Sequence, residues 1–245
     1  KSKRERLVWA SLDHSNILPL YGYAEEEDRF GFFGSLISPW YEHGDATTFL
    51  REFDKQIDPN TRIRLWEEVV AGVHYLHSQI PSIVHGDLKP ENILIDDGGH
   101  ARLSDFGLVR LFSDQDEDTE GINTTSPHTG TTRYLAYELV AGDEVLLPTM
   151  ASDMYALGCV GLVFILRQLP YGNRKCSLIE RDILDQIPPA RRPAHGDSTL
   201  TDQDHVVWDL LERCWNLDPS ARLTSQQLAD YLAGRSNVFL VGRGG

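Results

Sequence analysis

A short helical pattern opens the chain, because apolar residues recur among charges at near-helical spacing within residues 1–12. Residues 16–23 then predict a strand, in which Pro19 fits an edge position or a bulge. Residues 31–38 predict its partner strand. The acidic run 25–28 lies between them and is typical of a solvated turn. The first part of the chain is therefore expected to hold one helix and two short strands.

From Pro39 onward the pattern becomes helical. Asp58 and Pro59 form a good helix start, since Asp caps well and Pro fits the first helical position. The apolar residues that follow recur on one face: Ile63, Trp66, Val69, Val70, Val73 and Leu76. Residues 150–166 are apolar on nearly all sides, which predicts a central buried helix. Three further helices are expected, at 178–187, 205–215 and 225–232.

Polar side chains that could take part in catalysis or binding are concentrated in the run HGDLKPEN at residues 85–92. It places the carboxylate of Asp87, the ammonium of Lys89 and the amide of Asn92 within six residues. Gly86 and Pro90 keep this run out of regular helix and predict a loop.

A hairpin is expected directly after this loop. Residues 93–95 predict a short buried strand, 96–99 the turn and 101–103 the return strand. The return strand would bring Asp105 back beside Asn92. An amide oxygen and two carboxylates would then converge with a lysine, which suits a hard cation bound together with phosphate.

Length, charge and cysteine content limit the range of functions that the protein can have. At 245 residues the chain suffices for one large domain or two smaller ones. A formal net charge of −14 argues against a nucleic-acid partner. Cys159, Cys176 and Cys214 match neither a zinc pattern nor a disulfide framework, which favours a reducing, cytoplasmic setting. The longest apolar run, 156–166, is too short to span a membrane. Residues 113–132 lack an apolar period and predict a long mobile loop.

The run at 85–92, followed by DFG at 105–107, resembles the catalytic and metal-binding loops of the protein kinase family. The resemblance implies an α+β fold, with a small β-rich lobe and a mainly helical lobe. It implies that Asp87 is the base for the substrate hydroxyl and that Lys89 neutralises the γ-phosphate of ATP. Asn92 and Asp105 would hold Mg²⁺. Lysine at position 89 is similar to serine/threonine kinases rather than tyrosine kinases.

A segment farther upstream resembles the kinase gatekeeper and hinge. The resemblance makes Ser38 the gatekeeper and places backbone groups near Pro39 and Tyr41 against adenine. Asp45 would approach the ribose, and Leu94 would supply the apolar floor under adenine. ATP recognition is thus expected to depend mainly on backbone groups.

Residues 130–138 resemble the end of a kinase activation segment. In this comparison Thr131 hydrogen-bonds Asp87 and Lys89, and Asp153 braces the backbone of the catalytic loop from the start of the buried helix. His85 is expected to be a packed structural residue rather than a base or a metal ligand.

The family's A-P-E sequence is Ala-Tyr-Glu here, with Tyr137 in place of proline. Glu138 is still expected to form a structural pair with Arg222. The sequence CW at 214–215, followed by DP at 218–219, is typical of the tyrosine-kinase-like branch. The HGDLK sequence at residues 85–89 and the hinge segment particularly resemble those of fungal members of that branch.

The chain departs from the family pattern in two respects. Nothing matches the glycine-rich loop or the strand that carries the ATP-binding lysine. Lys1 and Lys3 are too close to Glu5, the expected partner of that lysine, because a strand and a loop must intervene. ATP affinity and turnover of this chain are therefore expected to be low. Gly86 replaces the usual arginine, so phosphorylation within residues 124–132 is not expected to be the main activating switch.

The resemblance divides the chain into a remnant of the small lobe at 1–38, a hinge and helical lobe at 39–234 and a tail at 235–245. The leading hypothesis is a serine/threonine kinase domain that phosphorylates protein hydroxyls, acts as a monomer and has regulatory protein partners. The alternative is a weak or inactive pseudokinase that serves as a binding module. A metal-dependent hydrolase using Asp87 and Asp105 is a third hypothesis, which would make the other kinase signals accidental.

Overall fold

The computed structural model describes residues 3–24, 35–106, 110–112, 131–141, 147–193 and 201–241. The expected acidic turn at 25–28 and most of the expected mobile loop at 113–132 lie outside these ranges. Among the described residues, no helix is long and apolar enough to cross a membrane.

None of the three cysteines forms a disulfide, and burial raises the pKa of the Cys214 thiol to about 12.

One helix and two strands form the first part, as the pattern predicts: α1 (Lys3–Ala10), β1 (Gly22–Ala24) and β2 (Ser35–Ile37). The strands pair antiparallel, with Tyr23 opposite Leu36. The prediction of a strand over 16–23 is wrong for most of its length, because strand structure begins only at Gly22.

Residues 16–18 instead contact the hairpin downstream. The Leu18 N–H donates to the carbonyl of Leu103, and the Leu103 N–H donates to the carbonyl of Asn16. An alternating apolar pattern predicts extended backbone but does not tell which neighbour it will pair with.

The expected hairpin is present as β4 (Ile93–Ile95) and β5 (Ala101–Leu103), which pair antiparallel with Ile93 opposite Leu103. Asp96 begins the turn and accepts hydrogen bonds from the N–H groups of Gly98 and His100. A second, separate pair consists of β3 (Ser82–Val84) and β6 (Arg110–Phe112).

Helices make up the rest of the described fold: α3 (Ala46–Glu52), α4 (Pro59–His77), α5 (Met150–Leu166), α6 (Cys176–Leu184), α7 (Asp202–Cys214) and α8 (Ser225–Val241). Helix α5 has the predicted bounds, and Asp58 caps α4 as predicted by accepting from the N–H groups of Asn60 and Thr61. Helix α6 begins two residues and ends three residues earlier than expected. Helix α7 begins three residues and ends one residue earlier than expected. Helix α8 runs past residue 232 into the expected tail.

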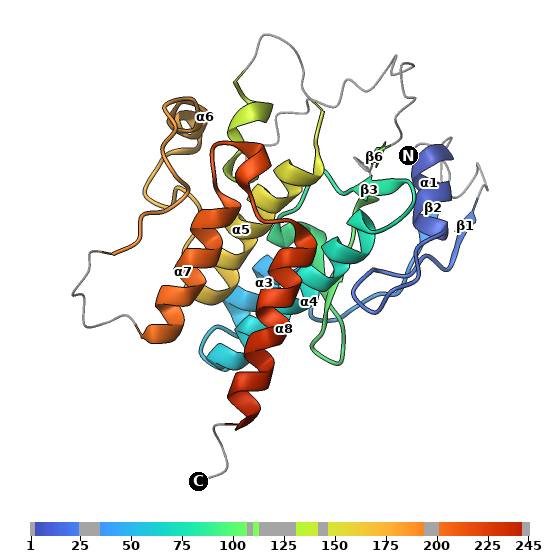
Figure 1. The fold of residues 1–245 in the computed structure, drawn as a ribbon. Coiled ribbons are helices and arrows are strands. Elements are labelled where there is room, and N and C mark those ends of the chain that lie inside the picture. Colours follow the sequence, from blue (N-terminus) through green and yellow to red (C-terminus); the bar gives the residue numbers. More distant parts are fainter. Residues whose placement is uncertain are drawn as a thin grey trace.

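Figure 1 shows the helical body, in which α4 packs against α5 and α8 while α5 also packs against α7. The strands β1 and β2 lie with α1 at one side of this body, and α6 lies at the other. The catalytic-loop region lies between β3 and β4, and β3 itself follows α4 along the chain.

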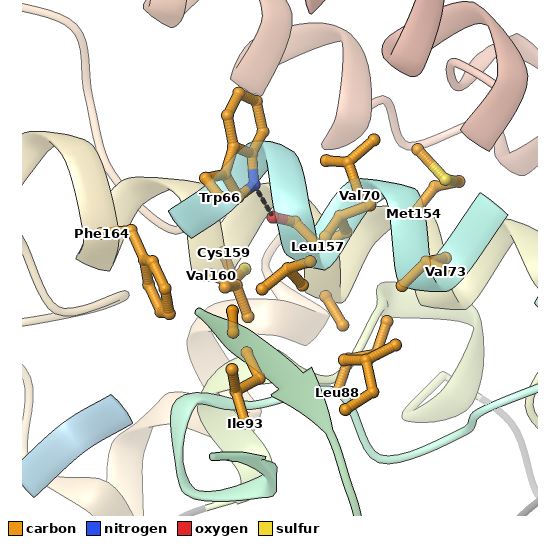
Figure 2. Close-up of a cluster of buried hydrophobic side chains, with 14 of the residues drawn as sticks. Trp66, Val70, Val73, Leu88, Ile93, Met154, Leu157, Cys159, Val160 and Phe164 are labelled. Carbon is orange, nitrogen blue, oxygen red and sulfur yellow. Dashed lines mark hydrogen bonds between the residues drawn. The ribbon is translucent and has the colours of Figure 1, made fainter. Parts of the chain in front are cut away.

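Part of the core lies where α4 and α5 meet the segment that carries Leu88 and Ile93 (Figure 2). The indole N–H of Trp66 donates to the carbonyl of Leu157 at 3.1 Å, which joins the two helices by a buried hydrogen bond. Gly161 permits this approach, since a Cβ there would lie 2.7 Å from the Trp66 ring. The predicted apolar face of α4 needs one correction: Ile63 is only half-buried, whereas Leu65 is completely buried.

Candidate active site

Asp153 fixes the backbone of the catalytic loop (residues 84–92). It lies in the first turn of α5, whose start is capped by Thr149, and its carboxylate is buried. Its Oδ2 accepts from the His85 N–H at 2.8 Å, and its Oδ1 accepts from the Gly86 N–H at 2.9 Å. His77 lies 3.0 Å from the same Oδ2. The brace expected from the sequence is therefore present.

Gly86 has a backbone conformation that suits glycine. Its φ is +80°, in the left-handed region that side chains disfavour. Gly86 stands where the kinase pattern has an arginine, and a glycine at this position also avoids backbone strain.

Three predicted residues meet at one carboxylate. Oδ2 of Asp87 accepts from Nζ of Lys89 at 2.7 Å and from Nδ2 of Asn92 at 2.8 Å. The same Asn92 nitrogen donates to the main-chain carbonyl of Asp87. Within the described part of the chain, no donor reaches the buried Oδ1 of Asp87. One oxygen of this carboxylate is held in place, and the other has no hydrogen-bond donor among the residues that the structure describes.

Asp105 returns beside Asn92 through the hairpin. The N–H and the hydroxyl of Ser104 both donate to the carbonyl of Asn92, at 2.9 and 3.0 Å. Asp105 itself is exposed and has a φ of +59°. This conformation is uncommon outside glycine and is often retained at functional sites.

The oxygen donors at this point suit a hard cation. Because Nδ2 of Asn92 donates to two Asp87 oxygens, the amide orientation leaves Oδ1 as the atom able to bind a cation. Asp105 adds a carboxylate. Among the described residues there is no cluster of three or more His, Cys, Asp or Glu, so phosphate and water oxygens would have to complete the shell. Mg²⁺ commonly binds in this way.

His85 is structural, as expected. It is fully buried, its Nδ1 accepts from the Asp87 N–H at 3.3 Å, and its Nε2 lies 3.1 Å from the Ser104 carbonyl. With Nδ1 as an acceptor, Nε2 is the ring nitrogen whose proton faces the Ser104 carbonyl.

Three packed aromatic rings, not predicted from the sequence, link α1 to the catalytic loop. Phe106 is fully buried, and its ring centroid lies 5.5 Å from that of Trp9 and 5.6 Å from that of His85. A signal was present, since Val8, Trp9 and Leu12 share one face of the first helix.

The expected nucleotide segment, residues 38–45, connects β2 to α3. Ser38 and Pro39 are half-buried, and the carbonyl of Tyr41 accepts from the Gly44 N–H at 3.1 Å. Asp45 caps α3, because its carboxylate accepts from the N–H and the hydroxyl of Thr48. Asp45 and Leu94 form a β-bridge, so two of the predicted residues lie side by side.

Burial raises the pKa of the half-buried Tyr41 phenol, an effect that Arg102 partly opposes.

The side chains of Thr131 and Glu5 lie outside what the structure describes. Their expected contacts, like the position of Gly107, therefore stay predictions.

Downstream, Glu138 and Arg222 form the expected pair through two hydrogen bonds of 2.6 and 2.7 Å. Tyr137 packs against a second apolar cluster formed by Tyr171, Ile179 and Ile183. The side chain that replaces the family's proline thus contributes apolar contacts to α6.

Arg133 also joins this region to the loop before α6, a role that was not predicted from the sequence. Its guanidinium donates to the carbonyls of Pro170 and Tyr171, at 2.7 and 2.9 Å. The segment after Thr131 is therefore held by Arg133 at the loop before α6 and by the pair of Glu138 with Arg222.

A family model described as "Protein kinase domain" matches residues 1–232. Receptor-interacting serine/threonine-protein kinase 3 of Rattus norvegicus is 32% identical over 251 residues, which cover 98% of this chain and 49% of that protein. Receptor-interacting serine/threonine-protein kinase 1 of Homo sapiens is 29% identical, over 87% of this chain and 31% of that protein. Human 3-phosphoinositide-dependent protein kinase 1 is 26% identical, over 96% and 38%. The chain spans about half the length of these relatives or less.

Proposed function

Because the chain belongs to the protein kinase family, we propose that it transfers the γ-phosphate of ATP to a serine or threonine hydroxyl of a protein, with Asp87 as the base. One observation carries this assignment of the base. Oδ2 of Asp87 is held by Lys89 and Asn92, while the buried Oδ1 has no donor within the described part of the chain. A carboxylate fixed at one oxygen can present the other to a hydroxyl proton.

The family assignment confirms several predictions. The chain is a kinase domain of the serine/threonine type, similar to kinases of the tyrosine-kinase-like branch, and its fold class is α+β. These relatives favour an enzyme over a binding module. The likeness to fungal members stays a prediction.

In the proposed reaction, Asp87 orients the substrate hydroxyl in line with the transferring phosphorus and accepts its proton. Lys89 lies 2.7 Å from Asp87, so its ammonium would stand between the base and the phosphate and neutralise charge on both. Asn92 and Asp105 would hold Mg²⁺, which neutralises phosphate charge when it is bound. Thr131 is proposed to hydrogen-bond Asp87 and Lys89 and so to align the loop.

On the nucleotide side, Ser38 is proposed as the gatekeeper, and Pro39 and Tyr41 would present backbone groups to adenine. Leu94 would lie beneath the base. Asp45 would contact the ribose, although its carboxylate already accepts two hydrogen bonds from Thr48. A carboxylate accepts more than two hydrogen bonds, so capping α3 and binding a hydroxyl are compatible.

The other parts of the proposal follow from the kinase assignment alone. They are the division at residues 38 and 234, regulatory protein partners, action as a monomer and a cytoplasmic location. None of them changes the role proposed for Asp87.

The decisive experiment is Asp87→Asn in the complete protein. Asparagine keeps the size and most hydrogen bonds of the side chain but cannot accept the hydroxyl proton. Phosphate transfer to a generic serine/threonine substrate should fall about 10²- to 10⁴-fold. Asp97→Asn is the matched control, because Asp97 is exposed in the β4–β5 turn. Equal transfer by wild type and Asp87→Asn would contradict the assignment and favour the binding module.

A further inference from the structure

A cleft of about 250 Å³ lies next to the catalytic loop. Pro90 and Glu91, which directly follow Lys89, line one part of it, and residues of α3 and the end of α5 line the rest. Tyr134 borders both this cleft and a smaller cavity that contains Asp87. The cleft is therefore lined in part by the loop that carries the carboxylate at which the substrate hydroxyl is expected.

Arginines outnumber acids in this cleft. Its lining contains Arg51, Arg62 and Arg167 but only two carboxylates, those of Asp54 and Glu91. The whole chain carries a formal net charge of −14, so an excess of positive charge here runs against the average of the molecule. An excess of positive charge in a concave site raises the local concentration of anionic ligands.

Asp54 does not cancel this excess, because two guanidinium groups share its carboxylate. Nη2 of Arg62 donates to Oδ1 at 2.8 Å, and Arg167 pairs with Oδ2. The side chain of Arg62 is only 4% exposed, and its Nη1 also donates to the carbonyl of Phe164. Arg62 is thus a fixed structural charge behind the two more exposed arginines.

Arg51 and Arg167 are accessible to a ligand. The side chain of Arg51 is 70% exposed and lies 3.9 Å from Glu52, a surface pair that contributes little energy. Arg167 caps α5 with a φ of +57°, which is uncommon for a residue other than glycine. The side chain of Arg167 is 54% exposed.

We propose that this arginine cleft binds an anionic side chain, either a carboxylate or a phosphate, that flanks the acceptor hydroxyl in the protein substrate. The inference rests on the proposed kinase function. An extended peptide advances about 3.3 Å per residue, so a hydroxyl at Asp87 places side chains a few positions away within reach of the cleft. The guanidinium fork binds carboxylate and phosphate oxygens in pairs. Glu91 repels an anion at the end nearest Lys89, so the anionic side chain lies over Arg51 and Arg167.

The test uses synthetic serine peptides of otherwise identical sequence. A glutamate, a phosphoserine, an alanine or a lysine is placed in turn at each of the five positions on either side of the acceptor. At the position that reaches the cleft, the wild-type protein should show a KM about three- to fivefold lower for the anionic peptides than for alanine. The glutamate and phosphoserine peptides distinguish the two sources of negative charge.

Arg51→Glu should abolish this preference and favour the lysine peptide at the same position. Arg181→Glu is the matched control, because Arg181 is an exposed arginine of α6 that does not line the cleft. Equal KM values for all wild-type peptides, or a preference that survives Arg51→Glu, would overturn the inference while the kinase function stands.

A binding measurement separates this inference from the proposed function. Fluorescence anisotropy of the labelled peptides needs no phosphate transfer. If no peptide is phosphorylated, the proposed function fails. Tighter binding of the anionic peptides that is lost in Arg51→Glu still supports the cleft, and equal binding of anionic and neutral peptides overturns it.

Discussion

The catalytic loop and the nucleotide segment 38–45 are both irregular backbone, yet the fold holds them in different ways. In the catalytic loop, side chains hold the backbone from below: Asp153 accepts from two consecutive N–H groups, and His85 is fully buried against Phe106. Its functional side chains also hold one another, as Asp87 does with Lys89 and Asn92. Such a loop has little freedom to rearrange.

Segment 38–45 is held by backbone hydrogen bonds and by peripheral side-chain contacts, such as the packing of His43 against Phe49 and Phe53. The Ile95 N–H donates to the Gly44 carbonyl at 2.9 Å, and Gly44 has a φ of +65°. Its largest side chain, Trp40, is 82% exposed. The difference matches the chemistry proposed for each part. Side chains that move protons require a rigid, buried support, whereas adenine recognition requires only that backbone groups point in the right direction.

The largest effect should come from removing the brace of the catalytic loop. Asp153→Ala leaves the N–H groups of His85 and Gly86 buried without an acceptor, each at a cost of about 1–3 kcal/mol. We expect the free energy of unfolding to fall by about 3–5 kcal/mol and phosphate transfer to be lost. Urea unfolding and a transfer assay measure the two effects.

The control for this change is Asp230→Ala, which removes an exposed aspartate from α8 and should alter stability by less than about 0.5 kcal/mol. If Asp153→Ala cost no more than this control, the catalytic loop would not be held from below. The contrast with segment 38–45 would then disappear.

A smaller effect is expected on the nucleotide side. Asp45→Ala removes the cap of α3 and should lower the free energy of unfolding by about 1 kcal/mol. If Asp45 also contacts the ribose, the KM for ATP should rise while that for the protein substrate stays the same. Asp45→Asn keeps a capping oxygen and separates the two roles, because it should restore stability. Unchanged ATP binding in both variants would leave Asp45 with a structural role alone.

The sequence was most informative where chemistry is concentrated in few neighbouring side chains. Asp87, Lys89 and Asn92 are close in sequence, and the turn that begins at Asp96 specifies the hairpin that returns Asp105. Local spacing and turn chemistry were therefore enough to predict their convergence. Helix α5 was equally predictable, because a helix that is apolar all round must be buried.

Pairings over long sequence distances could not be predicted without a template. Arg62 and its acceptor Phe164 are separated by 102 residues, and nothing in either local sequence identifies the other. The left-handed conformations of Asp105 and Arg167 are imposed by tertiary structure, since the local preference of both residues is against them. The misassigned strand at 16–23 has the same cause, because β5 competed with β2 as its partner.

The smallest effect concerns Tyr41, whose phenol is half-buried in segment 38–45. Burial is the main cause that raises its pKa, while Arg102 lowers it and Asp96, Asp97 and Tyr21 raise it. As pH rises past 10, the unfolded chain therefore loses this proton before the folded chain does. Ionisation then stabilises the unfolded state, so the contribution of Tyr41 to stability falls with rising pH.

Tyr41→Phe should remove this contribution, so its free energy of unfolding should decline less steeply above pH 10 than that of the wild type. Urea unfolding at pH 8, 9, 10 and 10.5 measures the two slopes. Tyr231→Phe is the control, because Tyr231 is an exposed tyrosine of α8 and its removal should leave the slope close to that of the wild type. Parallel curves for wild type and Tyr41→Phe would mean that Tyr41 is as open to water in the folded protein as in the unfolded chain. Segment 38–45 would then be held by its backbone hydrogen bonds, the α3 cap, the hydrogen bond from Glu42 to Asp97 and the packing of His43. The phenol of Tyr41 would contribute nothing, which would make the contrast with the catalytic loop sharper still.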